Sequence, residues 1–242
     1  MSRAAALDVL YVDNHVLAVC KPAGLPIVPD SSGDASLLEQ ARDWIGAEFS
    51  KPGKVFLGVV HRLDRPVSGV VVFGRTSKGA ARLSKAFAER GTTKVYWGVV
   101  AKPPSEESGS IEQHLWKDTE RNRVHVVSAT QDGARSASTN WRLLEERGRA
   151  LLELIPETGR SHQLRVACAT LGSPLLGDLR YGADRPLEDR SIALHAYSLT
   201  VPHPTRDMDL VIRTPPPDLD VWSFDTVRKA RMFGSRAEEV ER

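Results

Sequence analysis

The chain has 242 residues, of which 41% are hydrophobic and 26% charged, and its formal net charge is only +2. These values are ordinary for a soluble globular protein that is large enough to bury a substantial core. No apolar run approaches the ~20 residues that cross a membrane. The first residues lack the apolar centre of a signal peptide, so we expect a cytoplasmic protein.

Motifs for metals and nucleotide cofactors are missing from the sequence. The two cysteines, Cys20 and Cys168, stand far apart; we expect buried thiols, although spacing alone leaves a disulfide open. There is no CxxC, no HExxH and no paired Cys/His cluster, which argues against a structural zinc site. No glycine-rich phosphate loop is present either. We therefore expect no metal and no cofactor.

The first third of the chain predicts a hairpin, two helices and a strand. The hairpin covers Leu10–Lys21, and a helix follows at Ser36–Ile45, whose first residue forms a capping box with Glu39. An apolar strand is expected at Gly69–Gly74. The next helix covers Ser77–Arg90 and ends at a glycine, the residue that most often terminates helices.

The rest of the chain is mostly strands. Thr93–Val100 is rich in Val, Tyr and Trp, as strands are. The Pro/Ser/Glu loop Lys102–Gly109 is a candidate for the crossing between two halves. Thr158–Thr170 is predicted to start with a Thr-Gly turn and to become a helix, and a helical tail is predicted at 215–242. Further strands are expected at Ile111–Trp116, Val124–Ser128, Ala134–Leu144, Ala150–Pro156, Ser191–Val201 and Met208–Thr214. This pattern indicates an α+β fold with a large, mostly antiparallel sheet in one domain.

One loop, residues 61–69 (His-Arg-Leu-Asp-Arg-Pro-Val-Ser-Gly), has the character of an active-site loop. It places Asp64 between Arg62 and Arg65, and its Pro and Gly favour a turn between two apolar runs. A lone acid on a rigid loop at the end of a sheet suits a nucleophile or a base. The neighbouring guanidinium groups would keep the carboxyl ionised. A surface loop with a weak Arg–Asp ion pair is the alternative.

Three more blocks occur in a fixed order with this loop. They are Asp13–Leu25 with its Lys-Pro-Ala-Gly turn, Lys94–Val100, and Thr158–Val166 followed by Leu171–Asp178 and Leu194–Ala196. With these four collinear blocks, the chain resembles the RluA-type pseudouridine synthases over about Asp8–Thr214. The resemblance implies a long bent sheet of two halves with a central catalytic cleft. Because the chain starts almost at the hairpin, we expect no S4-type RNA-binding domain before it.

The resemblance implies an RNA pseudouridine synthase, an isomerase that acts on specific uridines of structured RNA, either 23S rRNA or tRNA. The target base is stacked in RNA, so it has to be extruded into a pocket. By match to the family motifs, the catalytic residues are Asp64, Tyr96 and Arg165. Asp64 attacks C1′, attacks C6 or abstracts a ribose proton; Tyr96 supplies a face for the uracil; Arg165 pairs with Asp64.

Other residues are expected to bind the substrate or to support the site. Arg62 would fill the space left by the extruded base or bind its phosphate, and Arg160 would bind phosphate or support Arg165. His162 and His195 are expected to be structural, and Lys21 to pack around the Pro-Ala-Gly turn. The predicted substrate-binding set is Arg62, Arg160, His61, Leu63 and Arg65. The expected partner is RNA, with no membrane and no metal, and the protein is expected to be a monomer.

Charge is unevenly distributed along the sequence. Residues 61–102 hold nine Lys or Arg and two acids, which suits a phosphate backbone. Lys78, Arg82 and Lys85 recur at helical spacing and can form one cationic face, although a merely solvated face is the alternative.

Three other functions can be weighed against an active synthase. A catalytically inactive RNA-binding module of the same fold predicts loss of Asp64, Tyr96 or Arg165, and all three are present. A glycoside hydrolase would need two carboxylates, whereas the motif loop offers one. A binding protein for acidic partners explains only the basic stretch.

Overall fold

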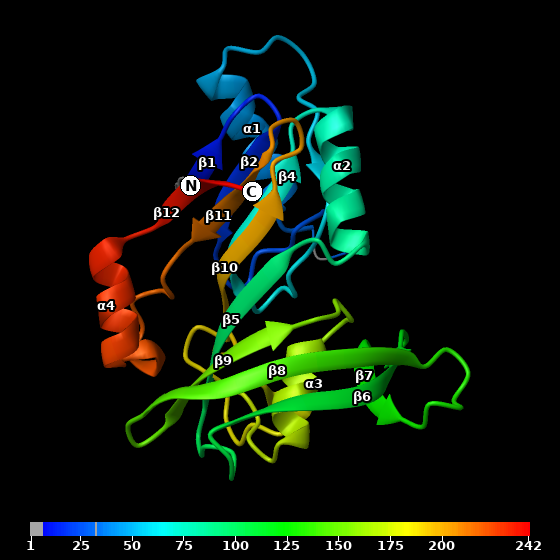
Figure 1. Ribbon diagram of the computed structural model, residues 1–242, viewed down its shortest axis with the longest axis vertical. Helices are drawn as coiled ribbons and strands as arrows, with labels where there is room; N and C mark the ends of the chain where they lie inside the picture. Colours follow the sequence, from blue (N-terminus) through cyan, green and yellow to red (C-terminus); the bar gives the residue numbers. More distant parts are fainter. Residues whose placement is uncertain (1–6, 32) are drawn as a thin grey trace. The chain divides into compact units, whose positions relative to one another are not determined.

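The computed structural model describes residues 7–31 and 33–242, which divide into two compact units (Figure 1). The first unit takes in the chain as far as Thr92, together with Ser198–Thr214 and Gly234–Arg242. The second unit consists of Thr93–Tyr197 and Pro215–Phe233. The chain therefore first crosses between the units at 92/93. The loop at 102–109 was expected to be that crossing, but it joins two strands inside the second unit, because its composition signals exposure and not a boundary.

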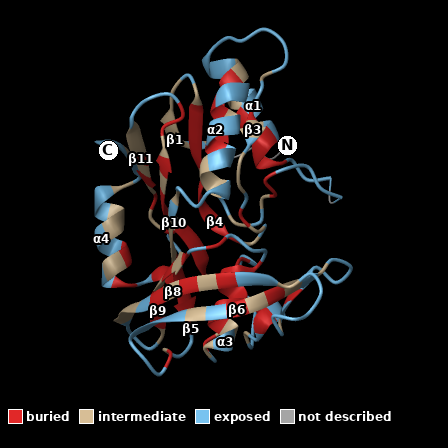
Figure 2. Cartoon of the chain, turned by 45° about the vertical axis from the view of Figure 1, so that its right-hand side comes forward, coloured by how far each residue is buried: buried red, intermediate tan, exposed pale blue. Residues whose placement is uncertain are grey.

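The first unit is built on antiparallel strands. Strand β4 is central and buried along its whole length, as the red colour in Figure 2 shows, and β3 pairs with it. Further antiparallel pairs join β1 to β2, β2 to β4, β10 to β11 and β11 to β12. The strands are β1 (Asp8–Val12), β2 (Val16–Lys21), β3 (Gly58–Val59), β4 (Ser68–Gly74), β10 (Leu194–Pro202, its last residues), β11 (Met208–Arg213) and β12 (Arg236–Glu241).

Two helices complete the first unit. Helix α1 (Leu37–Glu48) begins at Ser36 with the predicted capping box to Glu39, so that prediction is confirmed. Helix α2 (Ser77–Ala88) packs against β4. A Cβ atom at Gly74 would lie 2.4 Å from Ala80, so only glycine allows this close approach.

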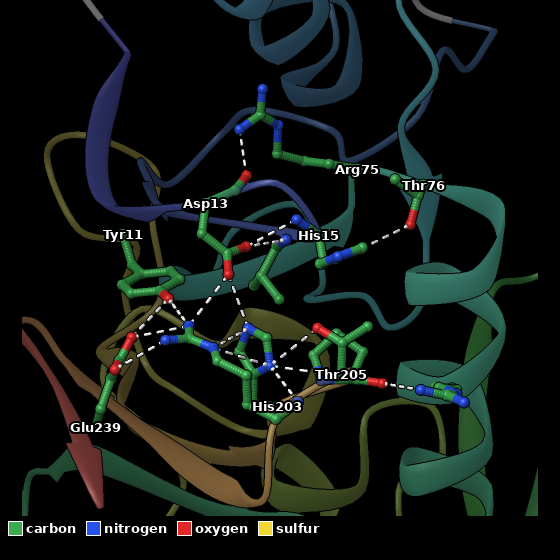
Figure 3. A network of polar contacts seen from close by, with 12 residues as sticks. Tyr11, Asp13, His15, Arg75, Thr76, His203, Thr205 and Glu239 are labelled. Atoms are coloured by element: carbon green, nitrogen blue, oxygen red, sulfur yellow. Dashed lines mark hydrogen bonds and ion pairs between the residues drawn. The ribbon is translucent and has the colours of Figure 1, made fainter.

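A polar network ties three chain segments of the first unit together (Figure 3). Asp13, in the β1–β2 turn, accepts hydrogen bonds from His203 Nε2 (2.7 Å) and Arg206 Nη2 (3.1 Å) in the β10–β11 turn. Arg206 also pairs with Glu239 on β12, and the Tyr11 hydroxyl donates to the same carboxylate (2.9 Å). Since the two turns and β12 are distant in sequence, the network fixes long-range pairing.

The second unit also rests on an antiparallel sheet, in the order β10–β5–β9–β8–β6–β7, with β10 contributing its first residues. Its core contains Trp97, Leu151, Trp222 and Phe224. The strands are β5 (Thr93–Val100), β6 (Ser108–Asp118), β7 (Arg123–Val127), β8 (Arg135–Glu146) and β9 (Ala150–Pro156). The helices are α3 (Gln163–Thr170) and α4 (Asp225–Phe233), with short 3-10 turns at Leu179–Tyr181 and Asp220–Trp222.

These elements confirm the predicted α+β class with a mostly antiparallel sheet. The predicted helical tail is right for α4 but wrong for Arg236–Glu241, which is strand β12. The mixed charges of this segment are also typical of a solvated helix. In the structure they pair across the strands instead, as Glu238 does with Arg213 at 3.0 Å. None of the helices in the described residues is long and apolar enough to span a membrane.

Candidate active site

The loop that carries Asp64 lies in the first unit, between β3 and β4. Leu63 and Val67 are buried on either side of the acid, whereas Asp64 itself is half-buried. The carbonyl of Asp64 accepts a hydrogen bond from Val67 N at 3.0 Å, which closes a tight turn. The two buried side chains anchor the loop and hold the carboxylate in one place.

Lys21 fixes the residue that follows the acid. Its side chain is fully buried, and Nζ donates to the carbonyls of Pro22 (2.9 Å), Leu25 (2.8 Å) and Arg65 (3.0 Å). Gly24 N donates to the same Arg65 carbonyl at 2.8 Å. Burial lowers the pKa of Lys21 to about 7, while the charge of Asp64 acts in the opposite direction. The Lys-Pro-Ala-Gly turn thus fixes the loop that carries Asp64, which agrees with the packing role expected for Lys21.

The other residues of the loop differ in what they contact. His61 Nε2 accepts from Val72 N at 2.9 Å, and the His61 ring stacks on Phe87, so His61 supports the loop. Arg62 is exposed and makes no hydrogen bond or ion pair with the part of the chain that is described. Arg62 can therefore reach a ligand.

Arg65 is engaged with the segment before α1. Its Nε donates to the Gly24 carbonyl at 2.8 Å, and its guanidinium forms ion pairs with Asp30 and Asp34. The sequence led us to expect Arg65 as a charge neighbour of Asp64. The structure shows that its charge is shared with two other carboxylates, because the turn directs the side chain toward residues 30–34.

In the second unit, Arg165 is held by a buried acid. It lies in the first turn of α3, and its Nε and Nη2 each donate to Asp178 at 2.7 Å. The guanidinium also lies 5.0 Å from the centre of the Tyr181 ring. Arg165 and Asp178 are 7% and 1% exposed, so this bidentate pair is shielded from water. The pair fixes the orientation of the guanidinium.

Gln163 organises the loop that leads into α3. Its Oε1 accepts from Arg160 N (3.0 Å) and from the Thr158 hydroxyl (2.7 Å), while its Nε2 donates to the Ser138 carbonyl (2.9 Å). Arg160 is exposed, and its Nε donates to the Ser136 carbonyl at 3.0 Å. Arg160 therefore lies on the rim of the loop, where a phosphate can reach it.

The two expected structural histidines are buried in the second unit. The backbone of His162 is left-handed (φ 52°), and its Nδ1 lies 2.7 Å from the Tyr181 hydroxyl. His195 is fully buried and lies edge-on to Trp222. Both positions agree with structural roles.

Tyr96 lies on β5, directly opposite Leu154 on β9, and is half-buried. The next residue, Trp97, faces the other side of the sheet, where it is buried and stacks on Tyr197 at 3.8 Å. The alternation of a strand thus separates the two rings. Trp97 serves the core, and the Tyr96 ring is the more accessible aromatic surface.

The predicted site residues fall into two groups. His61, Arg62, Leu63, Asp64 and Arg65 belong to the first unit, and Tyr96, Arg160 and Arg165 belong to the second. Sequence reasoning missed Asp178 and Tyr181 as the partners that hold Arg165. The signal for Asp178 was an acid at the end of an otherwise apolar Leu-Leu-Gly-Asp segment, where a carboxylate requires a buried cation.

Neither a metal cluster nor a disulfide is found in the described residues. No group of three or more His, Cys, Asp or Glu there could hold a metal ion. Cys20 and Cys168 are both free, which answers the question that their spacing left open. Burial raises the pKa of both thiols, so both are poor nucleophiles.

Residues 15–170 match the family described as RNA pseudouridylate synthase. This chain belongs to that family. It is 36% identical to an uncharacterized RNA pseudouridine synthase of Zymomonas mobilis over 81% of this chain and 88% of that one. It is 33% identical to the dual-specificity RNA pseudouridine synthase RluA of Escherichia coli, over 86% of this chain and 93% of that one. The resemblance to RluA-type synthases is thus confirmed.

Solved structures support the fold of this synthase. The human RNA pseudouridylate synthase domain containing 1 aligns with a TM-score of 0.72 and 25% identity, over 100% of this chain and 94% of that one. The human RNA pseudouridylate synthase domain containing 4 aligns with a TM-score of 0.76, over 91% of this chain and 93% of that one. At 24% identity the second likeness concerns the fold alone.

Proposed function

We propose that this synthase isomerises uridines of structured rRNA or tRNA, with Asp64 as the nucleophile or base that acts on an extruded uridine. The observation that carries the proposal is the clamped loop: buried Leu63 and Val67 and the Lys21 ammonium hold a half-buried carboxylate in place. A catalytic group needs such fixed support, because small displacements are costly in rate. The RNA classes are inferred from relatives, which include a ribosomal large subunit pseudouridine synthase D of Borreliella burgdorferi.

In this proposal Arg165 and Tyr96 complete the catalytic set. Asp178 engages Nε and Nη2 of Arg165, and Arg165 is the proposed partner of the Asp64 carboxylate, by its match to the family motif. A fixed guanidinium would orient that carboxylate. The half-buried ring of Tyr96 offers the uracil a face on which to stack.

Arg62 and Arg160 are proposed to bind the RNA around the reacting uridine. Both are exposed, and neither guanidinium forms an ion pair with a described residue. Arg62 lies two residues before Asp64 and would occupy the space left by the extruded base or bind its phosphate. Action as a monomer in the cytoplasm, without a metal ion, stays a prediction.

The test is Asp64→Asn, which keeps the shape of the side chain and removes its charge. We expect tritium release from 5-tritiated uridine in transcribed 23S rRNA and tRNA to fall below detection, with RNA affinity within about tenfold because phosphate contacts dominate binding. The matched control is Asp43→Asn, an exposed acid on α1 that should leave both readouts unchanged.

Two outcomes contradict the proposal. Substantial turnover by Asp64→Asn would remove the acid from the chemistry. A wild-type protein that binds these RNAs but releases no tritium, and whose removal from cells leaves the pseudouridine map of total RNA unchanged, would support the inactive RNA-binding module.

A further inference from the structure

The second unit contains a cavity that shares only Arg160 with the residues assigned above. It has a volume of about 390 Å³ and opens between the β6–β7 pair, the start of β8 and the loop at 159–161. Volumes of ~300–1,000 Å³ are typical of sites for small ligands. A hollow of this size admits one nucleotide, whereas a nucleic-acid duplex is too wide for it.

The charged residues that line the cavity are all cations. Lys117, Arg135 and Arg160 line it, and no acid is among its described lining residues. The side chains of Lys117 and Arg135 are exposed and form neither a hydrogen bond nor an ion pair with any residue in the described ranges. Three cations without a counter-charge, around a hollow one nucleotide wide, suit a phosphate group.

The cavity also offers an apolar surface for a base. Leu115 and Val124 form buried parts of its wall, and the half-buried Trp116 also lines it, with its ring next to the lining residue Gly133. Gly133 has a positive φ of 74°, and a Cβ there would be in ordinary contact with the Trp116 ring, at 3.4 Å. Aromatic rings of this kind stack on unpaired bases with little sequence preference.

The walls of the cavity are held rigidly. The Tyr181 hydroxyl accepts from Val124 N at 2.8 Å and lies 2.7 Å from His162 Nδ1, so it links β7 to the loop before α3. On that loop, Arg160 stands five residues before Arg165. The cavity is thus preformed, and its rim is continuous in the chain with the segment that carries the proposed catalytic arginine.

We propose that this cavity binds one unpaired nucleotide of the substrate RNA, distinct from the uridine that reacts. Its phosphate contacts Lys117, Arg135 and Arg160, and its base stacks on Trp116. The identity of the ligand as RNA rests on the proposed function. The cavity therefore selects single-stranded or looped RNA over a continuous duplex.

The first experiment compares two charge-matched double variants, K117A/R135A and K102A/R185A. All four residues are exposed cations of the second unit, but Lys102 and Arg185 do not line the cavity. The probe is a fluorescein-labelled, mixed-sequence, single-stranded RNA dodecamer. We expect K117A/R135A to weaken binding at least tenfold and to lower the slope of log affinity against log salt by about 0.7 for each phosphate group that is no longer bound. The control should change affinity less than twofold.

The second experiment separates stacking from charge. Trp116→Ala should weaken dodecamer binding about 5- to 100-fold without changing the salt slope, and Trp116→Phe should restore most of the affinity. Thermal melting identifies any Trp116 variant that fails to fold. The first experiment does not face this difficulty, because Lys117 and Arg135 are exposed and their replacement should not disturb folding. The same dodecamer as a duplex should show less than a threefold effect for every variant.

Equal loss of affinity in the two double variants would overturn the cavity site in favour of diffuse electrostatic attraction. Unchanged binding by K117A/R135A would overturn it as well, and in that case tritium release by the wild-type protein would leave the proposed function standing. Conversely, a clear difference between the double variants together with no tritium release by the wild type would retain the RNA site and reject the catalytic proposal.

Discussion

Two buried cations, Lys21 and Arg165, support the candidate site, and they donate to different kinds of acceptor. Lys21 donates to three neutral carbonyls, so burial dominates and lowers the pKa of Lys21 to about 7. Arg165 faces a full negative charge on Asp178, in a bidentate pair. A guanidinium remains protonated in such surroundings, whereas a buried ammonium titrates. The two cations should therefore respond differently to substitution and to pH.

Asp178→Asn should destabilise the protein and impair catalysis together. Removing one charge from a buried pair leaves the other unpaired, which costs about 3–5 kcal/mol. Urea denaturation measures this cost. Asp209→Asn breaks the exposed pair with Arg242 and should cost less than ~1 kcal/mol. Equal stability of the two variants would show that Asp178 does not hold Arg165 as the structure indicates.

Lys21→Met should reveal the titration of the buried ammonium. The folded pKa, about 7, lies below the ordinary value of 10.5, so between these pH values the unfolded chain binds more protons than the native state. The stability of the wild type should therefore rise with pH from about 7 to 10 relative to Lys21→Met. Denaturation in urea at pH 6.5 and pH 9.5 measures the difference. A pH-independent difference would contradict the lowered pKa.

At the scale of elements, the Asp13 network joins the β1–β2 turn, the β10–β11 turn and strand β12 of the first unit. Burial raises the pKa of Asp13, but hydrogen bonds from His203 and from the amides of His15 and Val16 outweigh it, so the net direction is downward. An acid with a depressed pKa stabilises the fold above its unfolded pKa, and this contribution is lost as the pH falls.

Asp13→Asn tests this network. The amide would turn a donor toward His203 and Arg206, and we expect a loss of about 1–3 kcal/mol at pH 7. The variant should also lose less stability than the wild type between pH 5 and pH 3. Asp218→Asn, whose carboxylate is exposed beside Arg231, is the control and should behave like the wild type. If Asp13→Asn loses as much stability between pH 5 and pH 3 as the wild type does, the network does not contribute to the pH dependence of stability.

Elements with a local signal could be predicted, and those that depend on distant partners could not. The capping box at Ser36 and the strand Thr93–Val100 each depend on residues that are close together in the sequence, and both predictions are confirmed. Strand β12 is mostly charged and exists because β11 offers it an edge to pair with. Of the apolar run that precedes the 61–69 loop, residues 55–60, only Gly58–Val59 forms a strand, the short β3, because strand length depends on the neighbours with which a segment pairs.

The same distinction applies to the candidate site. The motif at 61–69 could be predicted as a rigid loop, because its Pro, Gly and apolar residues act locally. The ion pairs of Arg65 with Asp30 and Asp34 could not, since a guanidinium on a turn has several acids within reach. The pair of Arg165 with Asp178 spans 13 residues and a helix, and sequence spacing does not encode it.

At the scale of the whole molecule, the small net charge conceals a local excess of positive charge. Within the basic stretch at 61–102 not every cation is available to a ligand. Arg75 is buried; it donates to the Asp13 carbonyl and lies 4.2 Å from the centre of the Phe49 ring. Lys78, Arg82 and Lys85 are exposed on α2. Helix α2 therefore retains a cationic face, while Arg75 serves the fold.

If that face tracks the RNA backbone, K78A/R82A/K85A should weaken RNA binding and lower the slope of log affinity against log salt by roughly 0.7–0.9 for each phosphate group that the variant no longer binds. The rate at saturating RNA should change little, whereas Arg62→Ala should lower that rate by impairing extrusion of the base.

The matched control is R42A/K51A/K54A, three exposed cations of the same unit. Arg82 also donates to the Pro204 carbonyl, so melting curves must show that the α2 variant is folded. Unchanged affinity and slope in a folded α2 variant would make the helix a solvated face and leave the assignment of Asp64 untouched.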